Sequence, residues 1–270
     1  RMSNLIHNLS NADYHAHPAV SSSQLKHMLR TPAHFKASLE TSKEPSDAMK
    51  LGSLVHTLLL EPHLVDYEYT VMPKFDRRTK QGKADYEAWL ERNAHKSIIT
   101  ADQMDTATAM TDSLKQSSVA KLLKVNRTLI EASIFYTDQD TGIDCRVRPD
   151  FLITPCDSFP NGLIVDLKTT DNASPSAFKR TITNFGYHLS AAMYLDGYEA
   201  HFGTCPAYIW LVAERDAPYA VASYTPSDEM LERGKQDLDS ALSMLRQCMD
   251  ADDYPAYSAD IATIDLPKWA

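Results

Sequence analysis

The segment Leu163-Ile164-Val165-Asp166-Leu167-Lys168 runs from three apolar residues into an Asp-x-Lys pair. Consecutive apolar residues of this kind are typical of a strand buried on both faces of a sheet. Side chains two positions apart on a strand face the same side, so we expect Asp166 and Lys168 to project together and Leu167 to face the other side. A carboxylate in that setting is costly unless a positive charge offsets it. A divalent cation such as Mg²⁺ would do so, because it binds carboxylates, water and phosphate oxygens.

Pro149-Asp150 lies 16 residues earlier, and the pattern places it within the preceding strand, 143–153. Two acids and a lysine would then converge at one edge of the sheet. Such a site could hydrolyse a phosphodiester, because the metal stabilises charge on the phosphate and the lysine orients or deprotonates the attacking water. The alternative is that Asp166 and Lys168 form an ordinary ion pair at a strand end, as most isolated Asp-x-Lys motifs do.

Two further residues are candidates for the same site. Glu131 interrupts the apolar strand 128–136, so it either supplies another acid or faces solvent on an edge strand. His56 lies in the apolar helix 48–60, where a lone histidine is usually a hydrogen-bonded core residue. A metal nearby would instead make His56 a ligand.

Alternating helix and strand patterns predict an α/β fold with a small mixed central sheet flanked by helices. We expect a single domain over 1–270, with a mainly helical part at 1–127 and a catalytic core at 128–270. The expected helices cover 24–30, a short segment from Pro32, 48–60, 83–93, 101–123, 175–185, 187–201 and 227–249. The expected strands cover 67–72, 128–136, 143–153, 162–169, 207–214 and 220–224.

Composition limits the classes of function. The 270 residues carry a net charge of −9, which argues against a protein that coats nucleic acid nonspecifically. Residues 73–96 nevertheless hold seven basic against four acidic residues, a local patch compatible with a polyanion held in a groove. Four cysteines without a CxxC pair do not fit a zinc ribbon, a disulfide framework or an iron–sulfur cluster. Without a membrane-length apolar run or a leading signal segment, we expect a cytoplasmic protein with no membrane partner.

An ordered set of short motifs carries a family resemblance over nearly the whole chain. The set comprises Tyr14-His15, Ser23-Gln24-Leu25, 52–56, Leu60-Glu61-Pro62, Phe75, Arg77-Arg78-Thr79, Gly82-Lys83, Gly142-Ile143, Cys145-Arg146, Arg148-Pro149-Asp150, Asp166, Lys168-Thr169-Thr170, Tyr187-His188, Tyr194, 196–200, Leu211-Val212-Ala213, Leu266-Pro267 and Trp269. The chain resembles the nuclease domain of RecE (exonuclease VIII) and, more distantly, lambda exonuclease and the RecB nuclease domain. All belong to the PD-(D/E)xK superfamily, so the resemblance implies a restriction-endonuclease-like core.

The resemblance also assigns roles to residues. It implies that His56, Asp150, Asp166 and the backbone carbonyl of Leu167 bind the metal. It makes Lys168 the catalytic lysine and Glu131 an accessory acid. The DNA-binding residues that it favours are Ser23, near a terminal 5′ phosphate, and Arg77, Arg78, Lys80 and Lys83. Tyr187 or His188 could position the substrate in place of a family glutamine that this sequence lacks, with helix packing as the alternative role for Tyr187. The basic segment alone could equally be a solvated loop.

The function implied is that of a Mg²⁺-dependent, ATP-independent exonuclease, with Mn²⁺ as a second option for the metal. It would degrade linear double-stranded DNA from 5′ to 3′, release 5′-mononucleotides and leave 3′ overhangs for recombination. The family suggests a homo-oligomeric ring, with a tetramer favoured over a trimer, a RecT-type single-strand annealing partner, and a bacterial or prophage origin.

One departure from the family pattern supports an alternative. The relatives carry a glutamine where this sequence has Ser190, and a serine has neither the reach nor the amide donor of a glutamine. The chain could therefore be a catalytically silent DNA-binding or scaffold module of the same fold.

Overall fold

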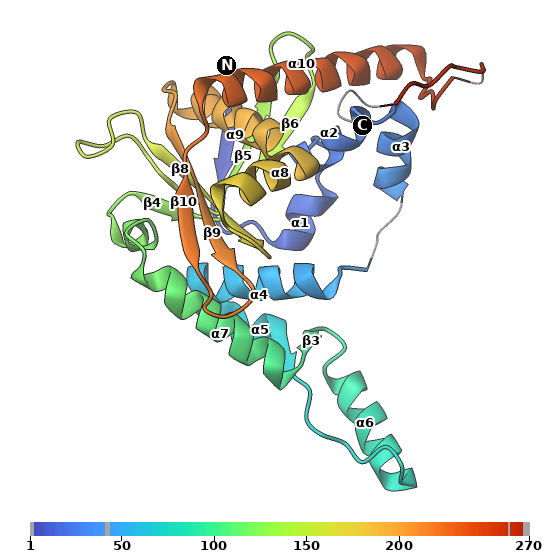
Figure 1. The fold of residues 1–270 in the computed structure, drawn as a ribbon, viewed down its shortest axis with the longest axis vertical. Coiled ribbons are helices and arrows are strands. Elements are labelled where there is room, and N and C mark those ends of the chain that lie inside the picture. Colours follow the sequence, from blue (N-terminus) through green and yellow to red (C-terminus); the bar gives the residue numbers. More distant parts are fainter. Residues whose placement is uncertain (1–2, 41–43, 259, 267–270) are drawn as a thin grey trace.

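A five-stranded mixed sheet lies at the centre of the computed structural model, which describes residues 3–40, 44–258 and 260–266 (Figure 1). Its strands run in the order β10-β9-β8-β7-β4, and only the β8–β9 pair is parallel. The strands are β4 (Thr128–Ile130), β7 (Phe151–Ile153), β8 (Leu163–Thr170), β9 (Ala207–Glu214) and β10 (Val221–Tyr224). The prediction of an α/β fold with a small mixed sheet is confirmed.

Helices cover both faces of this sheet and bury a separate apolar core on each side. One core contains Ile164 and Trp210 and packs under α2, α8, α9 and α10; the other contains Val165 and Leu167 and packs under α4 and α7. The bounds of these helices are α2 (Ser22–Met28), α4 (Asp47–Leu60), α7 (Ala101–Gln116), α8 (Pro175–Phe185), α9 (Tyr187–Phe202) and α10 (Asp228–Ala251). Successive residues of β8 thus alternate between the cores, which places Asp166 and Lys168 on the opposite side to Leu167, as expected.

Two of the predicted strands are broken in the middle, and this corrects the prediction. Residues 128–136 divide into β4 and β5 (Ser133–Thr137), and 143–153 divide into β6 (Asp144–Val147) and β7. The halves join different sheets: β5 pairs with both β1 (Ser3–Ile6) and β6 in a three-stranded sheet, whereas β4 and β7 belong to the central sheet. Pro149-Asp150 therefore lies between strands and not within one, because proline has no N–H for a ladder.

The N-terminal part is mainly helical and carries a projecting arm. Helix α6 (Lys80–Arg92) begins three residues earlier than expected because the Thr79 side chain caps it, accepting a hydrogen bond from the Gly82 N–H at 2.9 Å. None of the α6 residues is buried, and Figure 1 shows the helix standing away from the body. The arm is closed by a two-stranded sheet of β2 (Tyr69–Val71) and β3 (Ser97–Ile99).

The remaining elements complete the two layers. The expected helix over 101–123 ends at Gln116 and is followed by a separate 3₁₀ turn. The short elements are α1 (Asn11–Ala16), α3 (Pro32–Glu40), η1 (Pro62–Leu64), α5 (Val65–Glu68) and η2 (Ala120–Lys124).

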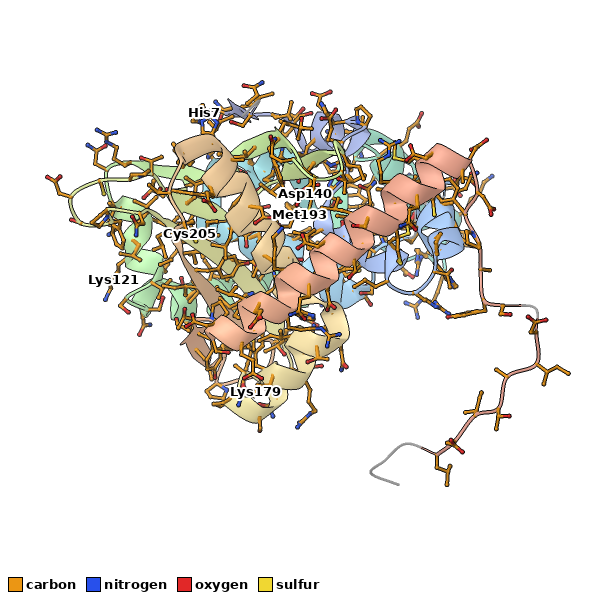
Figure 2. The ribbon with its side chains drawn as sticks, turned by 90° about the horizontal axis from the view of Figure 1, so that it is seen from above. His7, Lys121, Asp140, Lys179, Met193 and Cys205 are labelled. Atoms are coloured by element: carbon orange, nitrogen blue, oxygen red, sulfur yellow. The ribbon has the colours of Figure 1, made fainter. Side chains whose placement is uncertain are left out.

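Helix α10 crosses one face of the molecule, and the C-terminal segment extends away from it (Figure 2). Among the described residues, no helix combines the length and apolar character that crossing a bilayer requires.

Candidate active site

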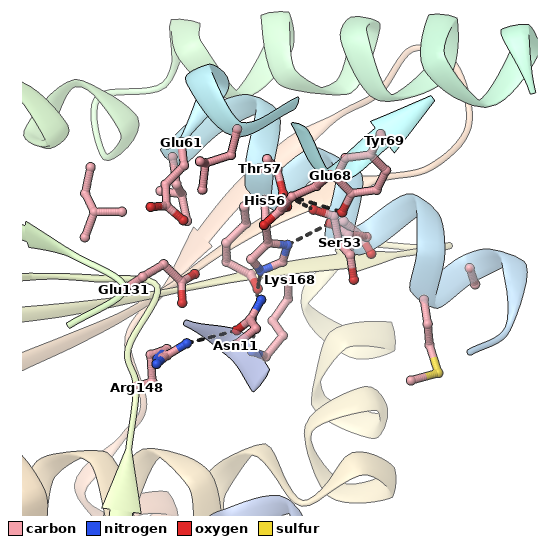
Figure 3. Close-up of a pocket in the computed structure, with 18 of the residues that line it drawn as sticks. Asn11, Ser53, His56, Thr57, Glu61, Glu68, Tyr69, Glu131, Arg148 and Lys168 are labelled. Atoms are coloured by element: carbon pink, nitrogen blue, oxygen red, sulfur yellow. Dashed lines mark hydrogen bonds between the residues drawn. The ribbon is translucent and has the colours of Figure 1, made fainter. Parts of the chain in front are cut away.

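A cavity of about 1210 Å³ opens beside β8, between α4 and the two strand breaks. Five of the residues singled out in the sequence line it: His56, Glu131, Leu167, Lys168 and Tyr187. Figure 3 shows Glu131 and Lys168 directed toward the same space beneath His56.

His56 is held by hydrogen bonds at both ring nitrogens. Nδ1 lies 2.8 Å from the Gly52 carbonyl oxygen, one turn earlier in α4, and Nε2 lies 3.0 Å from the carbonyl oxygen of Leu167. Nε2 also lies 3.4 Å from Asp150 Oδ1. Burial opposes protonation of the ring, but the Asp150 charge and hydrogen bonds outweigh it and raise the pKa of His56 to about 9. The histidine faces a centre that attracts positive charge.

Asp150 is positioned by the strand break that contains it. Its Oδ2 accepts a hydrogen bond from the Leu167 N–H at 2.5 Å, so the carboxylate bridges the break and β8. Burial alone would raise the pKa of Asp150, but the adjacent His56, and then Lys168, hold it below its usual value. Asp150 therefore remains ionised and available to a cation.

Asp166 and Lys168 form the predicted pair on one face of β8. Lys168 Nζ lies 2.5 Å from Asp166 Oδ1, and the Tyr208 hydroxyl donates to Asp166 Oδ2 at 3.0 Å. Asp166 is only 3% exposed, and this burial raises its pKa despite the lysine. Burial opposes the charge on Lys168, yet Asp166 and Asp150 raise its pKa above the usual value. The lysine is therefore an ammonium donor in this arrangement.

Glu131 lies at the other strand break. Its backbone adopts a positive φ of 47°, which is strained for a residue with a side chain, and its N–H donates to the Asp150 carbonyl oxygen at 3.1 Å. Burial, followed by repulsion from Asp150, raises the pKa of Glu131 to about 8. Glu131 thus lies beside Asp150 at the site and is not a solvent-facing residue of an edge strand.

The donor set fits a hard divalent cation in its chemistry. The Nε2 of His56, Oδ1 of Asp150 and the Leu167 carbonyl oxygen already converge on one another, and both oxygens are ligands that Mg²⁺ accepts. The Nδ1 contact with Gly52 orients the ring, as is usual for a metal-binding histidine. Asp166 is instead engaged by Lys168 and Tyr208, and within the described ranges no three His, Cys, Asp or Glu side chains are grouped closely enough to hold an ion by themselves. The role of Asp166 as a ligand stays a prediction.

The residues predicted to contact DNA lie in different places. Tyr187 lines the cavity, with Lys168 Nζ 5.0 Å from the centre of its ring. His188 is turned toward α10, where its Nε2 lies 2.9 Å from Asp237 Oδ2. Ser23 is exposed and shares a hydrogen bond with Ser21 at 2.9 Å, outside the described residues that line the cavity.

The basic residues of the predicted patch lie on the arm, remote from this cavity. Arg78 is 90% exposed and pairs with Asp76 at 2.9 Å, while Arg77 lies over the ring of Tyr86 at 4.9 Å. Lys80 and Lys83 occupy the first turn of α6 and are exposed. The arm and the cavity would therefore meet different parts of a long ligand.

The side chain of Ser190, the position where the resemblance implies a glutamine, points into the protein interior. It is 6% exposed, and its hydroxyl donates to the Ser22 hydroxyl at 3.1 Å, joining α9 to α2. A side chain in that position supports packing between helices and does not reach the cavity.

Two basic residues near the site had no role in the sequence prediction. Arg148 donates to Ser133 Oγ at 2.8 Å and to Asn11 Oδ1 and the Leu9 carbonyl at 2.9 Å, which ties the N-terminal segment to the strand break. Lys26 on α2 lies over the ring of Tyr187 at 5.5 Å. Burial and the charge of Lys168 lower the pKa of Lys26 to about 8. Arg148 belongs to the Arg148-Pro149-Asp150 motif of the sequence but was given no role there, and no sequence signal pointed to Lys26.

Comparison with protein families places this geometry in context. The profile of the PDDEXK-like domain of unknown function, DUF3799, matches residues 21–267. The chain belongs to the DUF3799 family. The sequence resemblance to PD-(D/E)xK nucleases and the predicted restriction-endonuclease-like fold are thereby confirmed. Nucleases of the PDDEXK type generally use divalent metals, in agreement with the donor set of this DUF3799 chain.

One solved structure shows the same fold, and a second is less similar. A "Putative exonuclease" from Eubacterium rectale is similar over 96% of each chain, with 12% identity and a TM-score of 0.60. A phage-related exonuclease from Haemophilus somnus matches 74% of this chain and 95% of its own, at 11% identity and a TM-score of 0.32. A search of curated proteins gave no match.

Proposed function

We propose that this DUF3799 domain is a divalent-metal-dependent, ATP-independent nuclease that hydrolyses phosphodiesters of linear double-stranded DNA. The observation that carries the proposal is that two cavity-lining residues, Lys168 and His56, are each paired with a carboxylate: Lys168 with Asp166 at 2.5 Å, and His56 with Asp150 at 3.4 Å. The Lys168 ammonium group can donate hydrogen bonds to a phosphate, and the carboxylates of Asp150 and Asp166 can bind a metal ion. Hydrolysis of a phosphodiester with a metal requires both kinds of group in one place.

His56, Asp150, Asp166 and the Leu167 carbonyl would hold the cation, Mg²⁺ or Mn²⁺. When bound, the ion would stabilise the negative charge of the phosphate under attack. Lys168 donates hydrogen bonds from its ammonium group, so it can orient a water molecule or hold a phosphate oxygen beside Asp166. With a pKa of about 8, Glu131 can exchange a proton at neutral pH and serves as an accessory acid.

The finer activity follows from the resemblance and is part of the proposal. The enzyme would act 5′ to 3′, release 5′-mononucleotides and leave 3′ overhangs for recombination. Arg77, Arg78, Lys80 and Lys83 would bind backbone phosphates of the duplex from the arm, and Ser23 would lie near the terminal phosphate. Tyr187 contacts the strand in the cavity, whereas the pairing of His188 with Asp237 is a reason to give His188 no direct contact.

The assembly is also a proposal. A closed ring, with four subunits favoured over three, would surround the duplex with several basic arms despite the net charge of −9 on each chain. The partner that fits this activity is a RecT-type annealing protein acting on the 3′ overhang. Both proteins would act in the bacterial cytoplasm, encoded by the bacterium or by a prophage.

The proposal is tested by cleavage of linear duplex labelled at its 5′ end, with Mg²⁺, with Mn²⁺ or with EDTA. We expect metal-dependent release of mononucleotides, and a loss of at least about 100-fold in rate for Lys168→Ala with duplex binding retained. Lys115→Ala, an exposed lysine of α7, is the matched control and should keep the wild-type rate. Wild-type protein that leaves duplex intact with every metal would disprove the nuclease assignment.

One observation favours a second candidate, a silent DNA-binding or scaffold module. Ser190 is buried against Ser22, so it offers no polar side chain to the cavity at the position where the resemblance implies a glutamine. For a silent module, the same experiment would show a mobility shift of the duplex without cleavage, and Lys168→Ala would behave like the wild type.

A further inference from the structure

Three large apolar side chains are exposed around the cavity. Met49 of α4, Tyr67 of α5 and Phe185 at the end of α8 all line it, with 63%, 73% and 60% of their surface exposed. A single exposed apolar residue needs no explanation, but several around one functional cavity indicate a surface that binds something apolar.

Phe185 is the best placed of the three. Its ring stacks on that of Tyr187, with centroids 5.7 Å apart and planes 21° from parallel. Gly186 lies between them with a φ of 61°, a left-handed turn that ends α8 and starts α9. The turn holds the two rings together and leaves much of Phe185 open to the cavity.

The Tyr187 ring connects this apolar surface to the catalytic pair. Lys168 Nζ lies 5.0 Å and Lys26 Nζ 5.5 Å from its centre. The stem of Lys26 packs beside Gly186, where an added Cβ would come within 3.3 Å of it. Lys168 is paired with Asp166, whereas among the described residues Lys26 makes no ion pair with an acidic side chain. The Lys26 ammonium group, close to the Tyr187 ring, is therefore the one available to an anion near the exposed Phe185 ring.

An exposed aromatic ring near lysine ammonium groups matches one repeat of a nucleic acid strand, a base joined to a phosphate. We propose that Phe185 is a base-stacking residue: an unpaired base of the cleaved strand stacks on its open face, while Lys26 and Lys168 hold the neighbouring phosphate. This inference rests on the proposed function and narrows its substrate. Bases within a duplex are stacked on one another, so the strand enters the cavity unpaired.

The inference predicts how binding depends on single bases. In EDTA, which prevents cleavage, the affinity of the full chain for a 5′-phosphorylated, 3′-fluorescein hexanucleotide is measured by anisotropy. A set of hexanucleotides with one abasic site each locates the stacked base. We expect one abasic position to weaken wild-type binding by about tenfold, since stacking on an aromatic side chain is worth that order of affinity.

Phe185→Ala should bind the intact oligonucleotide about tenfold more weakly and lose the discrimination against that abasic position. Phe185→Trp should restore both, which a general disturbance of α8 would not do. Leu39→Ala, an equally exposed apolar residue on α3, is the control and should behave like the wild type. Because Phe185 is exposed, its truncation does not open a core.

Two results would overturn the inference in distinguishable ways. If Phe185→Ala and each abasic site weaken binding by independent factors, the side chain does not stack on a base, and the nuclease assignment is untouched. If the wild type neither binds the oligonucleotides nor cleaves duplex with any metal, the inference fails together with the proposed function.

Discussion

Glu131 is a site residue with an unfavourable backbone conformation and an unfavourable buried carboxyl group. Its positive φ is strained, and its carboxyl group is buried close to Asp150. Costs of this kind persist only where surrounding structure enforces them, and they cluster at functional sites. Here the N–H of Glu131 bonds to the carbonyl of Asp150, so the two strand breaks fix each other and bring their acids together.

Replacing Glu131 with glutamine should stabilise the metal-free fold at higher pH. The folded pKa is about 8 against an ordinary value of 4.5, so wild-type stability falls as pH rises through that window, when only the unfolded chain has released its proton. Glutamine has no such proton. We expect the Tm advantage of Glu131→Gln, measured in EDTA, to be larger at pH 8 than at pH 5 by on the order of 10 °C.

Glu87→Gln, an exposed change on the arm, is the control and should show no such pH-dependent gain. An advantage that is independent of pH would mean that the carboxyl group of Glu131 titrates normally.

Individual site residues differ in how far the sequence predicted them. Asp166 and Lys168 follow from the period of one strand, and the structure places them as expected. The proximity of His56 to Asp150 depends on how α4 packs against β8, so the sequence supported it only through the resemblance. Lys26 and Phe185 gave no signal, because a lysine on a helix and a phenylalanine before a glycine are ordinary residues until tertiary structure brings them to one cavity.

The strand breaks explain what the sequence could not predict about the elements. Residues 128–136 and 143–153 each look like one continuous strand, because local pattern does not reveal that their halves pair in different sheets. The helices were predicted more closely: α4, α8 and α9 begin and end within one residue of expectation, since caps and glycines mark their ends.

The contact between α9 and α10 gives an element-level prediction. Gly234 of α10 lies so close to α9 that an added Cβ would come within 2.2 Å of the His188 carbonyl oxygen. Gly234→Ala should therefore separate the helices and lower the free energy of unfolding by about 1–3 kcal/mol, as overpacking does. This loss is expected although alanine favours an isolated helix by about 1 kcal/mol over glycine.

Denaturant unfolding measures the effect. Ser240→Ala lies on the same helix at an exposed position and should change stability little. A more stable Gly234→Ala protein would show that α10 moves away from α9 without cost, and that His188 is free to leave Asp237.

The distribution of charge concerns the molecule as a whole. The chain carries −9 overall, with a balance of +2 over 1–136 and −11 over the rest, and its densest basic segment lies on the projecting arm. Duplex DNA would be repelled by most of this surface and attracted by the arm. Attraction through one small element is weak for a monomer, so several arms acting on one duplex would account for binding by an acidic protein.

The salt dependence of duplex binding can show how many arms contact one duplex. Each phosphate neutralised contributes about 0.9 to the slope of log K against log salt concentration. Changing Arg77, Arg78, Lys80 and Lys83 together to alanine should reduce the slope by about 3–4 if one arm contacts the duplex, and by about 7 if two do. The measurement is duplex binding in EDTA between 50 and 300 mM salt.

A control with Lys115, Lys121, Arg127 and Lys179 changed, all exposed on the body, should leave the slope nearly unchanged. A change near 7 would support an assembly in which subunits share one duplex, a change of 3–4 would favour independent subunits, and no change would remove the arm from the DNA-binding surface.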